Sequence, residues 1–202
     1  MKPIRLILLR QGGTLWQDQD QLVGQKDAEL SLPGLSRAEK TAQLLRSEKI
    51  DRIYSSTLGR AVDTAKVVAK YHRLRVVAEG ELNERGFGAL EGMKKKDLVR
   101  EFKHLKSELE QRPEGGESRY LFEKRVIGFL EECLKQNEGR TILMVSHEGP
   151  ILVMQHYLTR FDTTKGDDDF RATPGGLSDF QIKNIQPLEV AVLKWDAVEH
   201  LN

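Results

Sequence analysis

"RLILLRQGG", residues 5–13, places a run of aliphatic side chains directly before an arginine, a glutamine and two glycines. A short apolar run bounded by Pro3 and by glycines is typical of a strand buried on both faces, as in a parallel sheet. Ligands of such sheets bind just beyond the carboxyl ends of the strands. The stretch therefore predicts a buried strand that delivers Arg10 and Gln11 to a binding site.

The rest of the chain alternates short apolar runs with segments of helical periodicity. Further strands are predicted at residues 51–56, 73–79, 140–149, 177–185 and 188–195. Helices are predicted at residues 35–50, 57–72 and 150–158, with Ser36 as the N-cap of the first. This alternation indicates an α/β sandwich with a mainly parallel sheet, in which the last two strands form an antiparallel edge.

The segment at residues 85–118 departs from that alternation. It is rich in charged residues and contains "MKKKDLVREFKHLKSELEQ" before "RPEGGES". We interpret it as a small helical cap over the site rather than as a second domain. The whole chain, residues 1–202, is then expected to form one domain, which its length permits.

Composition narrows the class of protein further. A net charge of +1 gives no reason to expect nucleic acid or an acidic membrane as a partner. No apolar run approaches the ~20 residues of a membrane span, and the first residues do not have the pattern of a signal peptide. The single cysteine, Cys133, lies in a helical segment and suits a reducing compartment. We therefore expect a cytoplasmic protein whose one thiol is structural.

Four polar residues could meet at the carboxyl edge of this sheet. Arg10 and His147 each follow an apolar strand, Arg60 opens the second helix, and Glu84 lies in the glycine-rich loop after the third strand. Guanidinium groups bind phosphate oxygens bidentately, and helix N-termini add main-chain donors. A carboxylic acid at the rim can protonate a leaving oxygen. The group predicts a site for a small phosphorylated molecule.

None of these residues is diagnostic alone. An arginine after a strand is more often a solvated charge, and a lone histidine is more often bonded to the main chain. The lysines at residues 94–96 are typical of a solvated helix face. The aspartates at residues 167–169 lack spaced partners, so we expect a loop there and no metal site.

Taken in order, the motifs are far more specific. They are "RQGG" at 10–13, "LVGQKDAELSLPGLSRAEKTAQLL" at 22–45, "IYSSTLGRAVDTA" at 53–65, "LNERGFGALEG" at 82–92, "PEGGES" at 113–118 and "VSHEGPI" at 145–151. Between residues 4 and 158 the chain resembles the histidine phosphatase superfamily, which contains phosphoglycerate mutases and small phosphomonoesterases. The length of the chain is similar to that of the compact phosphatases of this family, whereas the sequence of the loop at 82–92 is closer to that of the mutases.

The resemblance implies a three-layer αβα sandwich and a mechanism without metal or cofactor. Phosphate would lie between Arg10, Arg60 and His147. Glu84 would be the general acid and afterwards the base that activates water. Position 11 would carry the histidine that attacks phosphorus and becomes phosphohistidine. The matching segments would place Gln17 and Gly24 at a substrate rim.

The sequence departs from the family pattern at the nucleophile. The family has Arg-His-Gly-Glu where this chain has Arg10-Gln11-Gly12-Gly13, so Gln11 replaces the histidine and Gly13 the glutamate. Gln17 replaces a common asparagine. A primary amide has its nitrogen lone pair delocalised into the carbonyl, so Gln11 can donate to phosphate but cannot carry a phosphoryl group.

Three functions are compatible with this change. The first is a binding or regulatory protein that captures a phosphate monoester and turns it over poorly or not at all. The second is an active phosphomonoesterase in which Glu84 activates water or His147 attacks. The third is an ordinary phosphatase or mutase whose site was altered for study. Because at least two residues of one loop differ together, we favour natural divergence and the first function. The sequence carries no signal for an oligomeric state.

Overall fold

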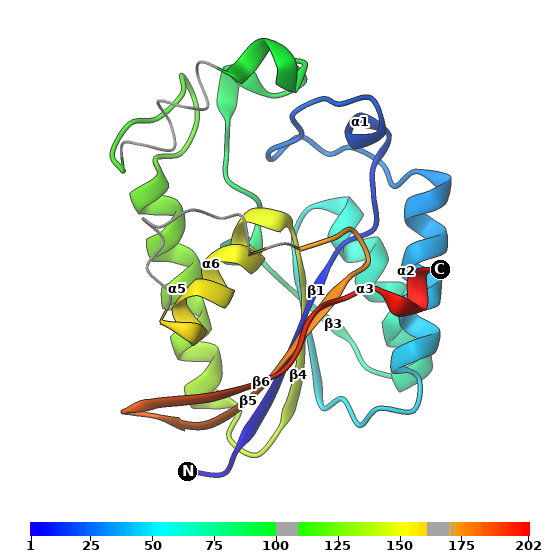
Figure 1. Cartoon of the computed structure of the whole chain (residues 1–202), viewed down its shortest axis with the longest axis vertical. Coiled ribbons are helices and arrows are strands. Elements are labelled where there is room, and N and C mark those ends of the chain that lie inside the picture. Colours follow the sequence, from blue (N-terminus) through cyan, green and yellow to red (C-terminus); the bar gives the residue numbers. More distant parts are fainter. Residues whose placement is uncertain (100–108, 161–169, 171) are drawn as a thin grey trace.

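One mixed sheet of six strands forms the centre of the part of the chain that the structure describes. This computed structural model describes residues 1–99, 109–160, 170 and 172–202, and the aspartates at 167–169 lie outside those ranges. The sheet has the strand order β3-β2-β4-β1-β5-β6 (Figure 1). The strands are β1 Ile4–Arg10, β2 Arg52–Ser56, β3 Val76–Glu79, β4 Thr141–Ser146, β5 Leu177–Ile185 and β6 Leu188–Ala197.

The opening strand is as central as its apolar run predicts. β1 pairs with β4 in parallel and with β5 antiparallel, so both of its edges are hydrogen-bonded. Leu6 and Leu8 pack into the core on one face of the sheet, and Ile7 and Leu9 pack into the core on the other. A strand covered on both faces needs aliphatic side chains at successive positions, which explains the continuous run. The antiparallel edge formed by β5 and β6 is confirmed.

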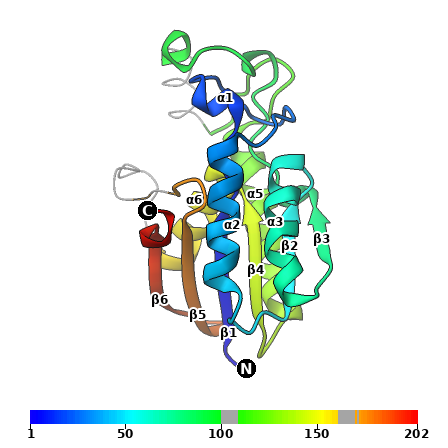
Figure 2. The ribbon, with the colours of Figure 1, turned by 90° about the vertical axis from the view of Figure 1, so that its right-hand side faces the viewer.

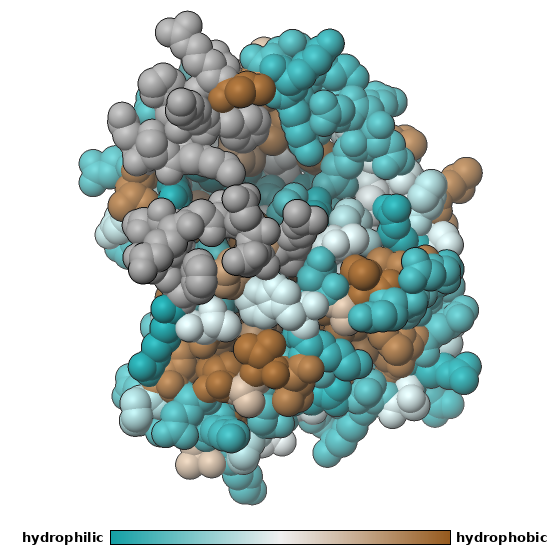
Figure 3. Space-filling view, in the orientation of Figure 1, coloured by the Kyte–Doolittle hydropathy of each residue, from teal (hydrophilic) through white to brown (hydrophobic). Residues whose placement is uncertain are grey.

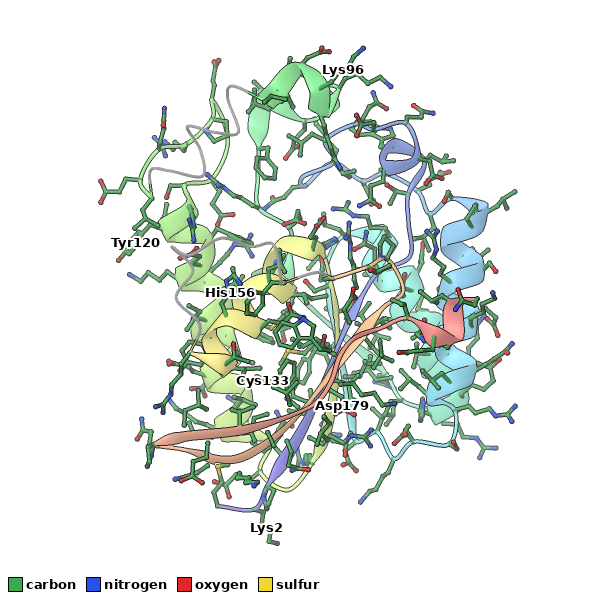
Figure 4. All side chains as sticks on the ribbon, in the orientation of Figure 1. Lys2, Lys96, Tyr120, Cys133, His156 and Asp179 are labelled. Carbon is green, nitrogen blue, oxygen red and sulfur yellow. The ribbon has the colours of Figure 1, made fainter. Side chains whose placement is uncertain are left out.

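Helices cover both faces of this sheet, which confirms the αβα sandwich. α2 Leu32–Leu45 and α3 Gly59–His72 lie on one face. α5 Arg119–Gln136 and α6 Glu148–Thr159 lie on the other (Figure 2). Cys133 of α5 points into the core between α5 and the sheet (Figure 4), and burial raises the pKa of its thiol to about 11. A buried and protonated thiol fits the structural role predicted for it.

The start of α2 differs from the prediction. Ser31, not Ser36, is the N-cap, because its Oγ accepts a hydrogen bond from the Gly34 amide at 3.2 Å. Pro33 fits inside the first turn, where a missing amide hydrogen costs nothing. Gly12 lies against Gly34 so closely that a Cβ at Gly12 would be 2.2 Å from the Gly34 carbonyl oxygen. The loop after β1 is therefore held by main-chain packing against α2.

The cap is less helical in its described part than the sequence suggests. It contains two 3₁₀ helices, η2 Gly88–Leu90 and η3 Lys95–Leu98, at the top of Figure 1. The predicted longer helix falls partly on residues 100–108, which lie outside the described residues. The Leu22 amide donates to the Met93 carbonyl at 2.9 Å, so the described cap is joined to the loop that follows β1.

One face of the molecule combines hydrophilic and apolar side chains. Among the coloured residues of Figure 3, hydrophilic side chains predominate, and apolar side chains gather in the lower half of the view. No helix in the described ranges is long and apolar enough to cross a membrane.

Candidate active site

A cavity of about 390 Å³ lies at the carboxyl ends of β1 and β4, below the cap. Its walls come from the loop after β1, the start of α3, the loop after β3 and the start of α6. The lining residues are Gln11, Gln17, Gln21, Leu22, Val23, Gly24, Arg60, Glu84, Phe87, Lys95, His147, Glu148, Gly149 and Leu152. Parallel strands thus bring residues 11, 60, 84 and 147 to one place, as expected from the strand ends.

His147 belongs to a buried chain of hydrogen bonds. Arg60 Nε donates to His147 Nδ1 at 3.2 Å, and His147 Nε2 contacts Ser56 Oγ at 2.8 Å. Ser56 Oγ in turn donates to Asn83 Oδ1 at 2.8 Å. Because Nδ1 accepts from a guanidinium, a neutral His147 carries its proton on Nε2 and donates it to Ser56. Burial, reinforced by the positive charges of Arg60 and Arg10, holds the pKa of His147 well below its ordinary value.

This depressed pKa predicts how stability depends on pH. In the unfolded chain the imidazole binds a proton near pH 6.5, whereas the folded protein keeps it neutral to a much lower pH. The unfolded state therefore binds more protons on the acid side of pH 6.5, and stability falls as the pH falls. For one such histidine the loss is at most about 2 kcal/mol between pH 7.5 and 5.

His147→Gln is expected to lose less stability over that interval. The glutamine amide can accept from Arg60 and donate to Ser56, but it cannot be protonated. Urea unfolding of both proteins between pH 7.5 and 5 measures the difference in slope. Parallel pH profiles for the two proteins would contradict a neutral, buried His147.

Arg60 is committed to main-chain acceptors as well as to His147. Its Nη1 donates to the Lys26 carbonyl at 2.7 Å, and its Nη2 donates to the Gly24 carbonyl at 2.6 Å. The side chain is only 3% exposed. Gly24 has φ +57°, and a Cβ there would collide with Glu91, so glycine is required at this turn. Arg60 therefore fixes the main chain at Gly24 and Lys26 and also places a positive charge on the cavity wall.

Glu84 has the properties of an acid. Its Oε1 accepts from its neighbour Arg85's amide at 2.9 Å, and its Oε2 accepts from the Gly149 amide at 3.2 Å. Burial raises the pKa of Glu84 from its ordinary value, against the opposing effect of these two donors; the charge of Glu148 raises it further and Arg60 lowers it. A carboxyl group on a cavity wall with a raised pKa is suited to proton donation.

The loop that carries Glu84 is fixed by an ion pair outside the cavity. Arg125 Nη2 donates to the Glu84 carbonyl at 3.0 Å, and Arg125 Nη1 donates to the Glu81 carbonyl at 2.6 Å. Two nitrogens of Arg125 also bind the carboxylate of Glu117 at 2.8 and 2.9 Å. The bidentate geometry fixes the guanidinium and, through it, the main chain at Glu84.

Arg10 and Gln11 have different surroundings although they are adjacent. Arg10 is not among the residues that line the cavity; its guanidinium donates to the Ala172 carbonyl and pairs with Glu148. Gln11 lies on the cavity wall and is 1% exposed. Among the described residues, its Oε1 has no hydrogen-bond partner. A buried acceptor without a partner costs about 1–3 kcal/mol, which is tolerated where a ligand binds.

The two predicted rim residues, Gln17 and Gly24, both line the cavity. Gln17 Oε1 accepts from the Thr14 amide at 3.0 Å, so its side chain is also part of a capping box of α1 Leu15–Asp18. At Gly13 a Cβ would approach Arg37 Nη1 to 3.1 Å and no main-chain atom. A side chain fits at Gly13 if the flexible arginine shifts slightly.

Sequence reasoning missed several lining residues, among them Gln21, Phe87, Lys95 and Glu148. Lys95 was expected on a solvated face, yet it lines the cavity, whereas Lys96 points outward at the tip of the cap (Figure 4). Glu148 follows His147 directly, so its position after a strand was the available signal. Over the described ranges, no three histidine, cysteine or carboxylate residues are grouped as a metal site.

Comparison with known proteins identifies similar chains. The model of the histidine phosphatase superfamily (branch 1) matches residues 6–192. A probable phosphoglycerate mutase GpmB of Yersinia enterocolitica is 34% identical over 149 residues, which are 71% of this chain and 69% of that protein. Phosphoserine phosphatase 1 of Hydrogenobacter thermophilus is 32% identical over 167 residues, which are 80% of this chain and 79% of that protein.

Solved structures of other proteins have the same overall fold. The phosphoserine phosphatase of Entamoeba histolytica, in complex with 3-phosphoglyceric acid, superposes with a TM-score of 0.84 at 28% identity, covering 98% of this chain and 100% of that one. A mutant of that enzyme, with a histidine changed to alanine and with phosphoserine bound, has a TM-score of 0.85 at 28% identity and the same coverage. A putative alpha-ribazole-5'-P phosphatase of Escherichia coli has a TM-score of 0.85 at 26% identity and covers 96% of each chain.

Proposed function

Because the chain belongs to the histidine phosphatase superfamily, we propose that it binds a phosphate monoester in the cavity but turns it over poorly or not at all. The observation that carries the proposal is Gln11, which is buried on the cavity wall at the end of β1, where the family's nucleophilic histidine is expected. An amide cannot accept the phosphoryl group, so the covalent route is blocked at its first step.

The groups that would hold a phosphate are otherwise present. Arg60 supplies a buried positive charge, and the Gln11 amide supplies an N–H donor on the same wall. The N-terminus of α6, at Glu148 and Gly149, adds the partial positive charge of a helix of 12 residues. The histidine mutant of the Entamoeba phosphatase, which was solved with phosphoserine bound, supports the idea that binding can persist when a histidine is lost.

The geometry argues against His147 as a replacement nucleophile. Both of its ring nitrogens are engaged, one by Arg60 and the other by Ser56, and the ring is 1% exposed. An attack on phosphorus would require a free lone pair aimed into the cavity. Water activated by Glu84 is the remaining alternative route, because the Glu84 carboxyl group lines the cavity.

The substrate class we propose is a small phosphomonoester. The cavity volume of about 390 Å³ suits a metabolite rather than a phosphoprotein loop or a nucleic acid. The relatives named above, which include a phosphoserine phosphatase and a probable phosphoglycerate mutase, support the same class. The single cysteine, which is free and buried, supports a cytoplasmic location. We also propose that residues 85–118 form a cap within one domain.

Two measurements on the unmodified protein test this function. Calorimetric titration with inorganic phosphate should detect binding, and an aryl phosphate assay should detect little or no hydrolysis. Strong hydrolysis would overturn the binding-protein proposal in favour of the Glu84 route. A gene that encodes histidine at position 11 would instead identify an altered ordinary phosphatase or mutase.

A further inference from the structure

The carboxylate of Glu148 forms an ion pair with the guanidinium of Arg10, which is the group that a bound phosphate is expected to contact. Arg10 Nη2 and Glu148 Oε2 are 3.0 Å apart, and the side chains are 10% and 51% exposed. Arg10 Nη1 is used by the Ala172 carbonyl, and Arg10 Nε has no partner among the described residues. Nη2 of Arg10 therefore faces a side chain that lines the cavity, because its acceptor is the Glu148 carboxylate.

The position of Glu148 resembles that of a bound anion. It is the first residue of α6, directly after His147, and it lines the same cavity as Gln11 and Arg60. A helix N-terminus favours a negative charge at this point, whether it comes from a side chain or from a ligand. Glu148 is also half-exposed, so its carboxylate can leave Arg10 and remain solvated. It differs in this from Asp179, a buried carboxylate that is fixed by Arg5 in the core.

We propose that Glu148 is a built-in competitor of the phosphate group, so that binding at Arg10 requires the Glu148 carboxylate to move away. The inference rests on the proposed function, since it assumes that the cavity takes a phosphate monoester. It adds a residue that sets the affinity of the site, because each phosphate must displace the Glu148 carboxylate from Arg10 and then lie near it. Like charges at this separation repel, so the intact protein binds phosphate more weakly than its two arginines alone would allow.

The test is the phosphate affinity of Glu148→Gln. This change removes the charge and keeps the size and the hydrogen-bonding oxygen, so Arg10 stays satisfied until phosphate arrives. We expect the dissociation constant for inorganic phosphate to fall about tenfold or more, which corresponds to ~1.4 kcal/mol or more. Glu189→Gln on β6 is the matched control, because it removes the same charge at an exposed position away from the cavity. Its affinity should equal that of the unmodified protein.

The outcomes separate this inference from the proposed function. Tighter binding by Glu148→Gln alone supports competition, also if the unmodified protein binds too weakly to measure. Equal or weaker binding by Glu148→Gln, with measurable binding by the unmodified protein, overturns competition and leaves the proposed function standing. Absence of binding by all three proteins, with unchanged thermal unfolding, overturns both. An equal gain in both variants would be an effect of net charge and would also overturn the inference.

Discussion

Gln11→His is expected to raise phosphatase activity by several orders of magnitude. The change restores an imidazole whose lone pair can attack phosphorus, at a position already buried on the cavity wall. Removal of a covalent nucleophile from a well-studied hydrolase costs about 10⁶ in rate, which sets the upper limit of the gain. Glu84, the general acid that we propose, has a raised pKa, and under this proposal the nucleophile is the main missing group.

The gain is expected to stop short of that limit. The new imidazole needs a partner to fix its orientation, and poor orientation alone can cost ~10². Gly13→Glu in the same protein should recover part of the difference, and the structure has room for it because the nearest atom to a Cβ there is Arg37 Nη1. Gly12 offers no such room, since a Cβ would meet the Gly34 carbonyl at 2.2 Å.

The gain in activity is measured as the rate of hydrolysis of an aryl phosphate, phosphoserine and phosphoglycerates. The unmodified protein is compared with Gln11→His and with Gln11→His combined with Gly13→Glu. Acid-labile phosphohistidine should appear only in the proteins that carry histidine at position 11. As a control, Glu84→Gln added to Gln11→His should lower the rate by ~10²–10⁴, because a general acid is removed. If both revertants remain inactive, the site has changed beyond its nucleophile and the fold does not serve phosphoryl transfer.

Arg60→Ala is expected to weaken phosphate binding by at least ~10². Charge-assisted hydrogen bonds contribute about 1.5–3 kcal/mol each, and Arg60 is the buried cation that lines the cavity directly. The same change frees the Gly24 and Lys26 carbonyls and His147 Nδ1, so the cavity wall should also loosen. Calorimetric titration with phosphate gives the loss in affinity.

Two comparisons separate lost binding from lost folding. Arg60→Lys keeps the charge but cannot span the two carbonyls and His147, so it should bind phosphate with intermediate affinity. Arg46→Ala removes an exposed arginine of the same charge and should bind like the unmodified protein. Circular dichroism and thermal unfolding establish that each variant is folded. Equal phosphate affinity in Arg60→Ala and the unmodified protein would remove Arg60 from the site.

Local pattern was enough to predict most of the fold. β1 and β4 are covered on both faces, so each needs aliphatic residues at successive positions. Such a run can be recognised directly in the sequence. Small residues of α3 such as Ala61 and Ala65 recur at helical spacing because they pack against the sheet. The sequence-based error at the α2 cap arose because both Ser31 and Ser36 precede suitable turns, and packing of the Gly12 loop on Gly34 favours the earlier one.

The sequence by itself determined which polar residues end the strands, and it predicted that Arg10, Arg60, Glu84 and His147 meet there. The last three line the cavity together with Gln11, whereas Arg10 does not. Only the tertiary structure decided how their charges are balanced. Burial and nearby arginines keep His147 neutral, and burial outweighs its donors in raising the pKa of Glu84. These effects depend on distance and solvent exclusion between elements far apart in the chain, which no local pattern encodes. The same holds for Glu148, whose carboxylate lies on Arg10 because β1 and β4 are neighbours in the sheet although about 135 residues separate them.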